Sequence, residues 1–347
     1  MNKEFIKEAG WLRIIIWLCL LTFFVVAPFV GVSINVSLSK ILEQFVMNVI
    51  LALAMVPMIR SGCGLNFGLP LGVMAGLLGA LISLEFCPTG LSSVAKFGVF
   101  TIALCIAVLI AAALGYCYGK LLNRVKGYEM ITSVFVGLFT TALMPALWLT
   151  LPFKNPMLIF SSRGEGLRGT ITLSEFWGQV LNEFLAIEMG SFTIPAGTLL
   201  FISAVFFLAQ YFMRIKTGVL MVTAESNSYS HTSVINTERA RLFSVMLSTI
   251  LGAVGVIVYV QSFGFIVLHR AYYTFPAVAS IILGGASVNK ASIWNAIVGT
   301  FLYFGCLTMR GSSILSEATG ANLGNIILII IGGIILCSFT GKVQVEK

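Results

Sequence analysis

Long apolar segments, separated by short polar stretches, follow one another along almost the whole chain. A helix needs about 20 mostly apolar residues to cross the hydrocarbon core of a membrane. The candidate spans are residues 11–30, 41–59, 65–84, 97–118, 130–151, 196–213, 242–260, 275–285, 292–309 and 323–339. The eighth is short, which is also typical of a broken or re-entrant span. The pattern predicts an all-α fold, a polytopic membrane helical bundle of about ten transmembrane helices.

Composition and charge agree with a lipid environment. Of the 347 residues, 58% are hydrophobic and 10% charged, with a mean hydropathy of +1.01, whereas soluble domains carry about 25% charged residues. The net charge of +8 comes from cations scattered through the loops. With both termini inside, the inner segments hold fourteen Lys and Arg against seven outside, as the positive-inside rule requires. We therefore expect both termini in the cytoplasm.

Two connections are longer than turns. Residues 152–195 fall outside, and residues 214–241 fall inside and form the most polar stretch of the chain. The inner segment divides one transmembrane domain, residues 1–347, into a first half (1–213) and a second half (242–347). MIRSGCGLNFGL at 58–69 and VIVYVQSFGFIV at 256–267 each place a Ser and a Gly near the end of an apolar run. This similarity predicts pseudo-repeated halves, which are common in transporters.

The segment RSGCGLNFGLPLGVMAGLLGA, residues 60–80, is the strongest local feature. Its glycines interrupt a helical pattern, and unpaired backbone at membrane depth is tolerated only beside a cavity or within protein. Transporters bind polar solutes at such breaks, so Ser61, Asn66 and Phe67 are candidate pathway residues. The alternative is a cytoplasmic turn before a packing helix. Glycines at every fourth position over 68–76 predict a ridge that packs against another helix.

Neutral polar residues within the spans form a second set of candidates. They are costly in lipid and face a bundle interior or an aqueous cavity, although an interhelical hydrogen bond explains any single one equally well. With an aromatic neighbour at each of the two breaks, they predict a weakly polar, uncharged pathway. Its candidate residues are Asn48, Ser61, Asn66, Phe67, Gln261, Ser262 and Phe263.

The sequence lacks the signatures of several other functions. All thirteen acidic residues are Glu, which removes Walker-B magnesium sites and aspartyl-phosphate chemistry. No Walker-A motif occurs, so the chain cannot cradle ATP phosphates itself. The seven Cys form no C-x-x-C pair and the two His lie far apart, so we expect neither a metal site nor a cofactor. The sequence contains no recognisable Ser/His/Asp or Cys/His arrangement of catalytic residues. We also find no charged residue in mid-span that could bind a coupling ion, which argues against an ion-driven carrier.

Four segments resemble one family, the permease subunits of bacterial ABC importers for simple sugars and nucleosides. SGCGLNFGLPLG resembles its glycine-rich break, although Asn66 replaces the Asp of the sugar members. GKLLNRVKGYEMITSVFVGLFTTAL resembles its basic turn and following helix. In AESNSYSHTSVINTERARLFSVMLSTILGAVGVI, which resembles the segment that touches the ATPase, Ser230 and His231 replace a small Ala pair. ASIILGGASVNKASIWNAIVGTFLYFG resembles its Gly-Gly turn and the helix after it.

The resemblance implies a multi-pass protein of the bacterial cytoplasmic (inner) membrane and no enzyme activity in this chain, because ATP is hydrolysed by a separate subunit. It implies four partners: an ABC ATPase, a second permease subunit in a homo- or heterodimer, an extracytoplasmic solute-binding protein and membrane lipid. It implies no nucleic-acid partner. The imported solute would be small, neutral and polar, a simple sugar or a nucleoside. The alternatives are an ion-gradient-driven secondary transporter, an ABC permease for branched-chain amino acids, and an assembly partner without a pathway.

The two long connections supply candidate docking residues. In the cytoplasmic segment we expect the ATPase to contact residues 224–238, with these candidates: Glu225, Asn227, Tyr229, His231 and Glu238. In the outer connection, Glu165, Glu175 and Glu183 are candidate salt-bridge partners of a binding protein. The stretch LSEFWGQVLNEFLAI predicts an amphipathic helix lying at the membrane interface, with Trp177 as its anchor.

Overall fold

The computed structural model describes residues 17–18, 20–22, 24–25, 27–30, 33–87, 90, 92–159, 167–190, 192–214, 237–268, 273–287 and 290–310. Its helices are η1 (Ala27–Val30), α2 (Ile34–Leu53), α3 (Met55–Arg60), α4 (Leu69–Glu85), α5 (Ser93–Arg124), α6 (Glu129–Thr150), α7 (Val180–Glu183), α8 (Ala196–Arg214), α10 (Thr237–Phe263), α11 (Thr274–Leu283) and α12 (Ile293–Arg310). Four short strands are β1 (Thr170–Thr172), β2 (Ala186–Met189), β3 (Phe192–Pro195) and β4 (Phe265–Val267). The predicted span 323–339 lies outside the described residues, as do residues 11–16, 19, 23 and 26 of the predicted span 11–30.

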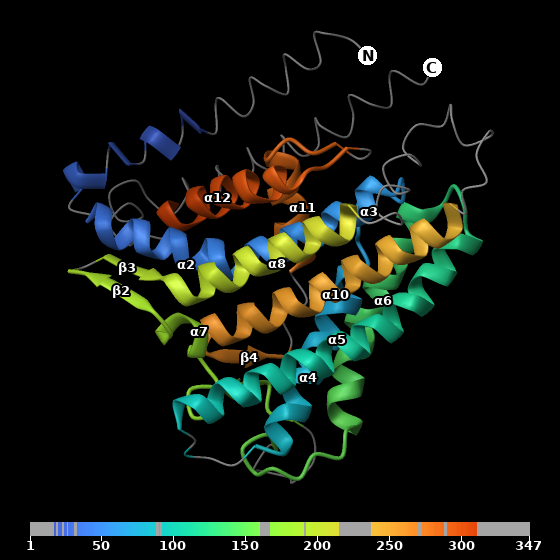
Figure 1. Ribbon diagram of the computed structural model, residues 1–347, viewed down its shortest axis with the longest axis horizontal. Helices are drawn as coiled ribbons and strands as arrows, with labels where there is room; N and C mark the ends of the chain where they lie inside the picture. The colour runs from blue at the N-terminus through green and yellow to red at the C-terminus, as the bar shows by residue number, and fades with distance from the viewer. Residues whose placement is uncertain are drawn as a thin grey trace.

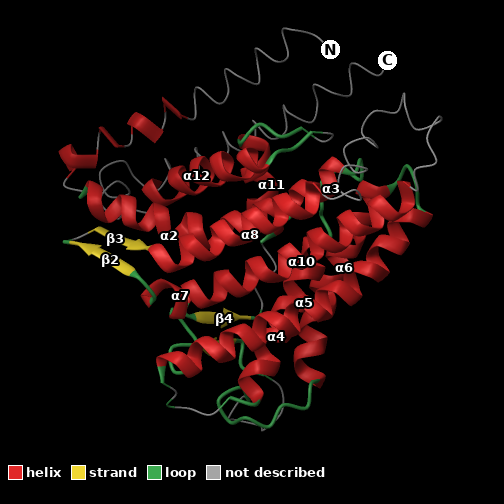
Figure 2. Cartoon of the chain, in the orientation of Figure 1, coloured by secondary structure: helices red, strands yellow, loops and turns green. Residues whose placement is uncertain are grey.

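The predicted membrane bundle is confirmed (Figure 2). In the described part of the chain, five helices are long and apolar enough to cross a membrane: Ile34–Arg60, Ser93–Arg124, Glu129–Thr150, Ala196–Arg214 and Glu238–Phe263. Three shorter apolar helices accompany them: Leu69–Glu85, Thr274–Leu283 and Ile293–Met309. The span predicted at 275–285 is indeed short, because α11 ends at Leu283 and the chain then turns at Gly285, whose φ is +95°.

Helix α10 lies at the centre of the bundle, with its most extensive contacts to α5, α4 and α2 (Figure 1). Glycines allow this close approach. A Cβ on Gly72 would lie 2.6 Å from the carbonyl oxygen of Thr249, and one on Gly76 would lie 2.7 Å from that of Ala253. The predicted glycine ridge is therefore confirmed as a packing surface: Gly72 and Gly76 pack against α10, and Gly68 packs against Tyr118 of α5.

The connections gather at two opposite ends of the helices. At the end that we call the basic end, Arg60 contacts Met213 and Lys126 contacts Glu238. At the other, the loop end, β1 pairs antiparallel with β4, and β2 with β3. Successive long helices run from one end to the other, as a chain that crosses repeatedly requires. Assignment of the basic end to the cytoplasm stays a prediction from the distribution of charge.

The predicted interfacial helix in the outer connection is wrong. Only Val180–Glu183 is helical, and a hairpin of β2 and β3 follows it. Gln179, with a φ of 58°, interrupts the helical pattern, and its N–H donates to the carbonyl of Gln261 at 2.8 Å. Trp177 is fully buried and packs edge-on against Phe100, with the ring centroids 5.8 Å apart. Its indole therefore belongs to the protein core rather than to a membrane interface.

Candidate functional site

The glycine-rich break begins with a regular helix stop. The N–H of Gly62 donates to the carbonyl of Ile59 at 3.1 Å, and the N–H of Cys63 donates to that of Met58 at 3.2 Å. This pair of bonds is a Schellman motif, which needs a left-handed residue after the helix, and the φ of Gly62 is +76°. The break runs from Ser61 to Gly68, where α4 begins, and we call it the break throughout.

Asn66 is the centre of a buried hydrogen-bond network within the break. Its amide donates to the Ser248 hydroxyl at 2.7 Å, and its carbonyl oxygen accepts from the Tyr118 hydroxyl at 3.4 Å. Ser248 in turn donates to the carbonyl of Ala54. The N–H of Gly68 donates to the Ser133 hydroxyl at 2.9 Å. Helices α5, α6 and α10 therefore satisfy the polar groups of the break, and Asn66 is fully buried.

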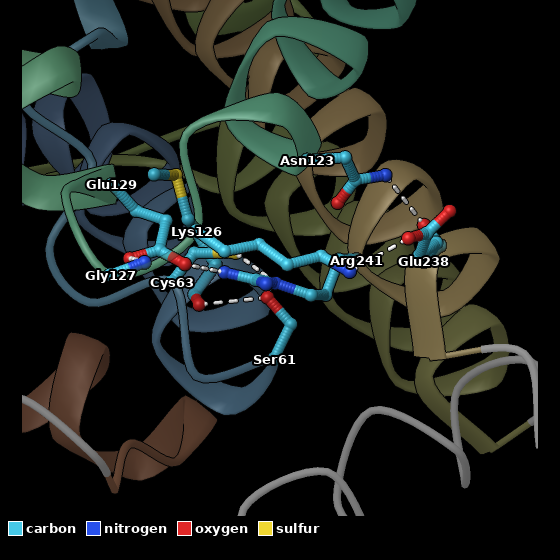
Figure 3. A network of polar contacts seen from close by, with 9 residues as sticks. Ser61, Cys63, Asn123, Lys126, Gly127, Glu129, Glu238 and Arg241 are labelled. Carbon is cyan, nitrogen blue, oxygen red and sulfur yellow. Dashed lines mark hydrogen bonds and ion pairs between the residues drawn. The ribbon is translucent and has the colours of Figure 1, made fainter.

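A charged network covers the break at the basic end (Figure 3). The Arg241 guanidinium, near the start of α10, forms an ion pair with Glu129, the first residue of α6. Its Nε also donates to the Cys63 sulfur at 3.3 Å. Glu129 accepts a second bond from the N–H of Gly127 at 3.0 Å. Only 14% of each charged side chain is exposed, so removing one partner leaves a largely buried charge, a change that costs about 3–5 kcal/mol.

A second ion pair joins the same two parts of the chain but lies in the open. Lys126 Nζ lies 2.7 Å from Glu238, and the two side chains are 54% and 59% exposed. The Asn123 amide donates to the backbone carbonyl of Glu238 at 2.9 Å. Exposed pairs of this kind contribute about 0–1 kcal/mol. The turn between α5 and α6 is therefore attached to the start of α10 by one buried and one exposed ion pair.

The second pair of pathway candidates, Gln261 and Ser262, lies at the loop end of α10. Gln261 accepts from the N–H of Leu181 at 3.2 Å and donates to the Ser262 hydroxyl at 2.7 Å. The Asn182 carbonyl oxygen accepts from Gln261, Ser262 and Thr198. This cluster ties α7 and α8 to the end of α10. Ser248 and Gln261 are 13 residues apart on one helix, which corresponds to roughly 20 Å. Gln261 and Ser262 lie within the last turn of α10 rather than in a second break, and the structure does not bring them together with Asn66.

The remaining pathway candidates make contacts of their own. Asn48, on α2, is buried and donates to the carbonyl of Gln44 at 2.9 Å. Ser61 is buried and donates to the carbonyl of Met58 at 2.9 Å. Phe67 is half-buried against the main core. Phe263 stacks on Tyr259 with ring centroids 5.8 Å apart. Whether these side chains line a pathway stays a prediction.

The docking candidates are only partly within the described residues. Glu225, Asn227, Tyr229 and His231 in the cytoplasmic segment lie outside them, as does Glu165 in the outer connection. Glu238 is held by Lys126 at the basic end. Glu175 and Glu183 are exposed at the loop end. Across the residues that the structure describes, no group of three metal-ligating side chains occurs.

The sequence did not reveal the residues that hydrogen-bond or form ion pairs around the candidate pathway residues. Arg241, Glu129, Tyr118, Ser248 and Asn182 make the decisive contacts, and several of them lie more than 100 residues from their partners. One signal was available: a chain with 10% charged residues places Glu129 and Arg241 at the starts of two apolar helices. The local sequence pattern does not show that these two side chains form an ion pair with each other.

Comparison with protein families matches residues 37–339 to a family described as the permease component of the branched-chain amino acid transport system. Comparison with curated proteins gave no match, and comparison with solved structures gave none. The matched region includes the break, the charged network and both ends of α10. The chain therefore belongs to this permease family and is a multi-pass membrane subunit of an ABC-type transport system, in which a permease works with an ATPase and a substrate-binding protein.

Proposed function

We propose that the chain forms the translocation pathway of an ATP-driven importer for a small, neutral, polar solute, a simple sugar or else a nucleoside. One observation carries the proposal. The buried polar side chains of the described residues are neutral hydroxyls and amides, among them Asn48, Asn66, Ser248 and Gln261. The least exposed ion pair, Glu129–Arg241, satisfies its own charges. Such an interior offers hydrogen bonds to hydroxyls without a fixed charge to trap the solute.

A branched-chain amino acid is the competing solute, since the family description names it. That solute carries both an ammonium and a carboxylate, and each needs an opposite charge or an aligned helix terminus where water is excluded. The buried polar side chains in the described part of the chain carry no charge that could serve either group. This favours the neutral solute. An ion-driven carrier is disfavoured because the chain belongs to an ABC permease family.

The ATPase and the binding protein would act at opposite ends. We place the ATPase at residues 224–238, between α8 and α10 at the basic end, with ATP hydrolysis on that separate subunit. The support is that Glu238 and Arg241, at the end of this segment, are joined to the turn before α6 and to the break. At the loop end, exposed Glu175 and Glu183 are available to basic residues of a binding protein.

The test begins with the tagged chain purified from its native membrane, together with the ATPase and binding protein that copurify. Titration of the binding protein with ribose, uridine and leucine identifies the solute class. Uptake of the same three solutes is then measured in proteoliposomes, with ATP on the ATPase side. We expect ATP-dependent uptake of ribose or uridine. Uptake of leucine alone would replace the solute, and uptake driven by an ion gradient without ATP would overturn the importer.

Docking at the loop end is tested separately by Glu175→Lys with Glu183→Lys. Both side chains are exposed, so the folded chain tolerates the reversal. We expect weaker stimulation of ATP hydrolysis by the binding protein, with basal hydrolysis unchanged. Deletion of residues 161–180 is a poor test because it removes Trp177 and Phe176, which are buried in the core. Unchanged stimulation in the double variant would place docking elsewhere.

A further inference from the structure

Three separate parts of the chain meet on one side chain at the basic end. Arg241 lies near the start of α10, at the last residue of the cytoplasmic segment 214–241. Its guanidinium contacts Glu129 at the start of α6 and Cys63 within the break. Figure 3 shows the side chain reaching across from α10 to both. A displacement of the start of α10 must therefore move the break or separate these contacts.

The contacts continue along one face of α10. Val245, one turn after Arg241, packs in a buried cluster with Met58, Cys63 and Tyr118. Ser248, a further turn along, holds the Asn66 amide at 2.7 Å. Residues spaced by three and four positions lie on the same helix face. This face of α10 therefore follows the break from its first residues to Asn66.

Stability alone is a weak explanation for the buried ion pair. The free-energy cost of desolvating two charges offsets much of their attraction. Apolar residues of similar size at the same positions often give a fold that is equally stable. The best-documented role of buried polar groups is to select one packing register of the helices, or one of two conformations of the protein. The nearby Lys126–Glu238 pair already attaches the same turn to the start of α10, and it does so in water. The buried pair adds a contact that the exposed pair lacks, the one to the break.

We propose that Arg241 is the positioning residue through which the cytoplasmic segment acts on the break. This rests on the proposed function. When the ATPase displaces the start of α10, Arg241 carries the movement to Cys63, and Ser248 on the same helix carries it to Asn66, and this opens or closes the basic end of the pathway. Without the guanidinium, the ATPase still binds and hydrolyses ATP, but each solute imported consumes more ATP.

The first experiment compares Arg241→Gln with a matched control, Lys126→Gln, which removes the exposed ion pair but leaves Glu238 in place, in the complete complex in proteoliposomes. The readout is the number of ATP molecules hydrolysed per solute imported. We expect this ratio to rise about fivefold or more in Arg241→Gln, the lower end of typical couplings between sites. Lys126 joins the same two elements as Arg241 but does not contact the break, so the Lys126→Gln control should keep the wild-type ratio. The charge exchange Glu129→Arg with Arg241→Glu should restore part of the coupling.

The second experiment follows the Cys63 thiol, which is 2% exposed against Arg241. A variant retaining only Cys63 is labelled with N-ethylmaleimide, with and without vanadate-trapped nucleotide. We expect trapping to change the labelling rate, and Arg241→Gln to abolish that nucleotide dependence. A variant retaining only Cys306, which is also 2% exposed but lies on α12, controls for general loosening and should label at one rate throughout.

The outcomes separate this inference from the proposed function. No ATP-dependent uptake by the wild-type complex would overturn both. Wild-type uptake with an unchanged ATP-to-solute ratio in Arg241→Gln would overturn the inference alone. Loss of the copurifying ATPase in Arg241→Gln, without rescue by the charge exchange, would show an anchor for assembly instead and would also overturn it. A raised ratio, its partial rescue and nucleotide-dependent labelling of Cys63 together would support it.

Discussion

Gly76→Ala tests whether α4 and α10 are held in contact by the absence of a side chain. The added Cβ would lie 2.7 Å from the carbonyl oxygen of Ala253 and 2.2 Å from a methyl carbon of Val256. The Val256 methyl belongs to a side chain, whereas the Ala253 oxygen belongs to the backbone of α10. Because ordinary contacts begin near 3.4 Å, the two helices must separate by about 3.4 − 2.7 = 0.7 Å.

That separation propagates because the next contacts are equally tight. Gly72, one turn earlier on α4, already lies against Thr249 and Gly252. Forcing extra volume into a close-packed interface costs about 1–3 kcal/mol. The matched control is Gly98→Ala on α5, where an added Cβ meets no heavy atom within 4 Å. Alanine is a better helix former than glycine by about 1 kcal/mol, so this control should be neutral or stabilising.

The assay is unfolding of the purified chain in mixed detergent micelles with increasing sodium dodecyl sulfate, followed by tryptophan fluorescence. We expect Gly76→Ala to lower the free energy of unfolding by about 1–3 kcal/mol and Gly98→Ala to leave it unchanged or raise it. Equal stability of Gly76→Ala and wild type would refute the packing argument. Equal losses in both variants would show that glycine flexibility matters at these positions, rather than contact between α4 and α10.

Three further predictions concern the polar contacts. Asn66→Ala should lower the unfolding free energy by about 0.6–1.7 kcal/mol, because Ser248 and Tyr118 lose their shared partner. It should also reduce uptake while the ATPase still copurifies. Uptake at the wild-type rate would show that Asn66 is a packing residue only. Gln261→Ala should speed proteolysis of the outer connection, since the N–H of Leu181 loses its acceptor. Glu85→Gln should lose one of two bonds to the backbone of residues 154–155, about 1 kcal/mol, measured in the same unfolding assay.

The positions of the described spans were predictable because membrane helices are defined by length and apolar composition alone. The span predicted at 130–151 is α6, Glu129–Thr150, and that at 196–213 is α8, Ala196–Arg214. The glycine ridge was predictable for a related reason: small residues at every fourth position leave one helix face without side chains. Its partner was not predictable, since several helices were equally apolar candidates.

The outer connection shows where the same reasoning fails. Its pattern of apolar and polar residues matches an amphipathic helix, and a Trp commonly marks the membrane interface. The structure instead buries Trp177 against Phe100 and turns the chain at Gln179. The deciding interactions are the bond from Gln179 to the carbonyl of Gln261 and the one from Leu181 to the Gln261 side chain. In both bonds the acceptor is Gln261 of α10, which is about 80 residues away in the sequence. Local hydrophobic periodicity cannot predict such long-range contacts.

The two ends of α10 are held by different chemistry, and the difference bears on the proposed movement of this helix. At the loop end, Gln261, Ser262 and Asn182 exchange short, directional bonds between neutral groups, which are lost once the donor and acceptor separate by about an ångström. At the basic end, the attraction between Arg241 and Glu129 falls only inversely with distance. An ion pair therefore keeps part of its attraction when it lengthens while water stays excluded. A pivot at the loop end with an elastic attachment at the basic end suits a helix whose basic end follows the cytoplasmic segment.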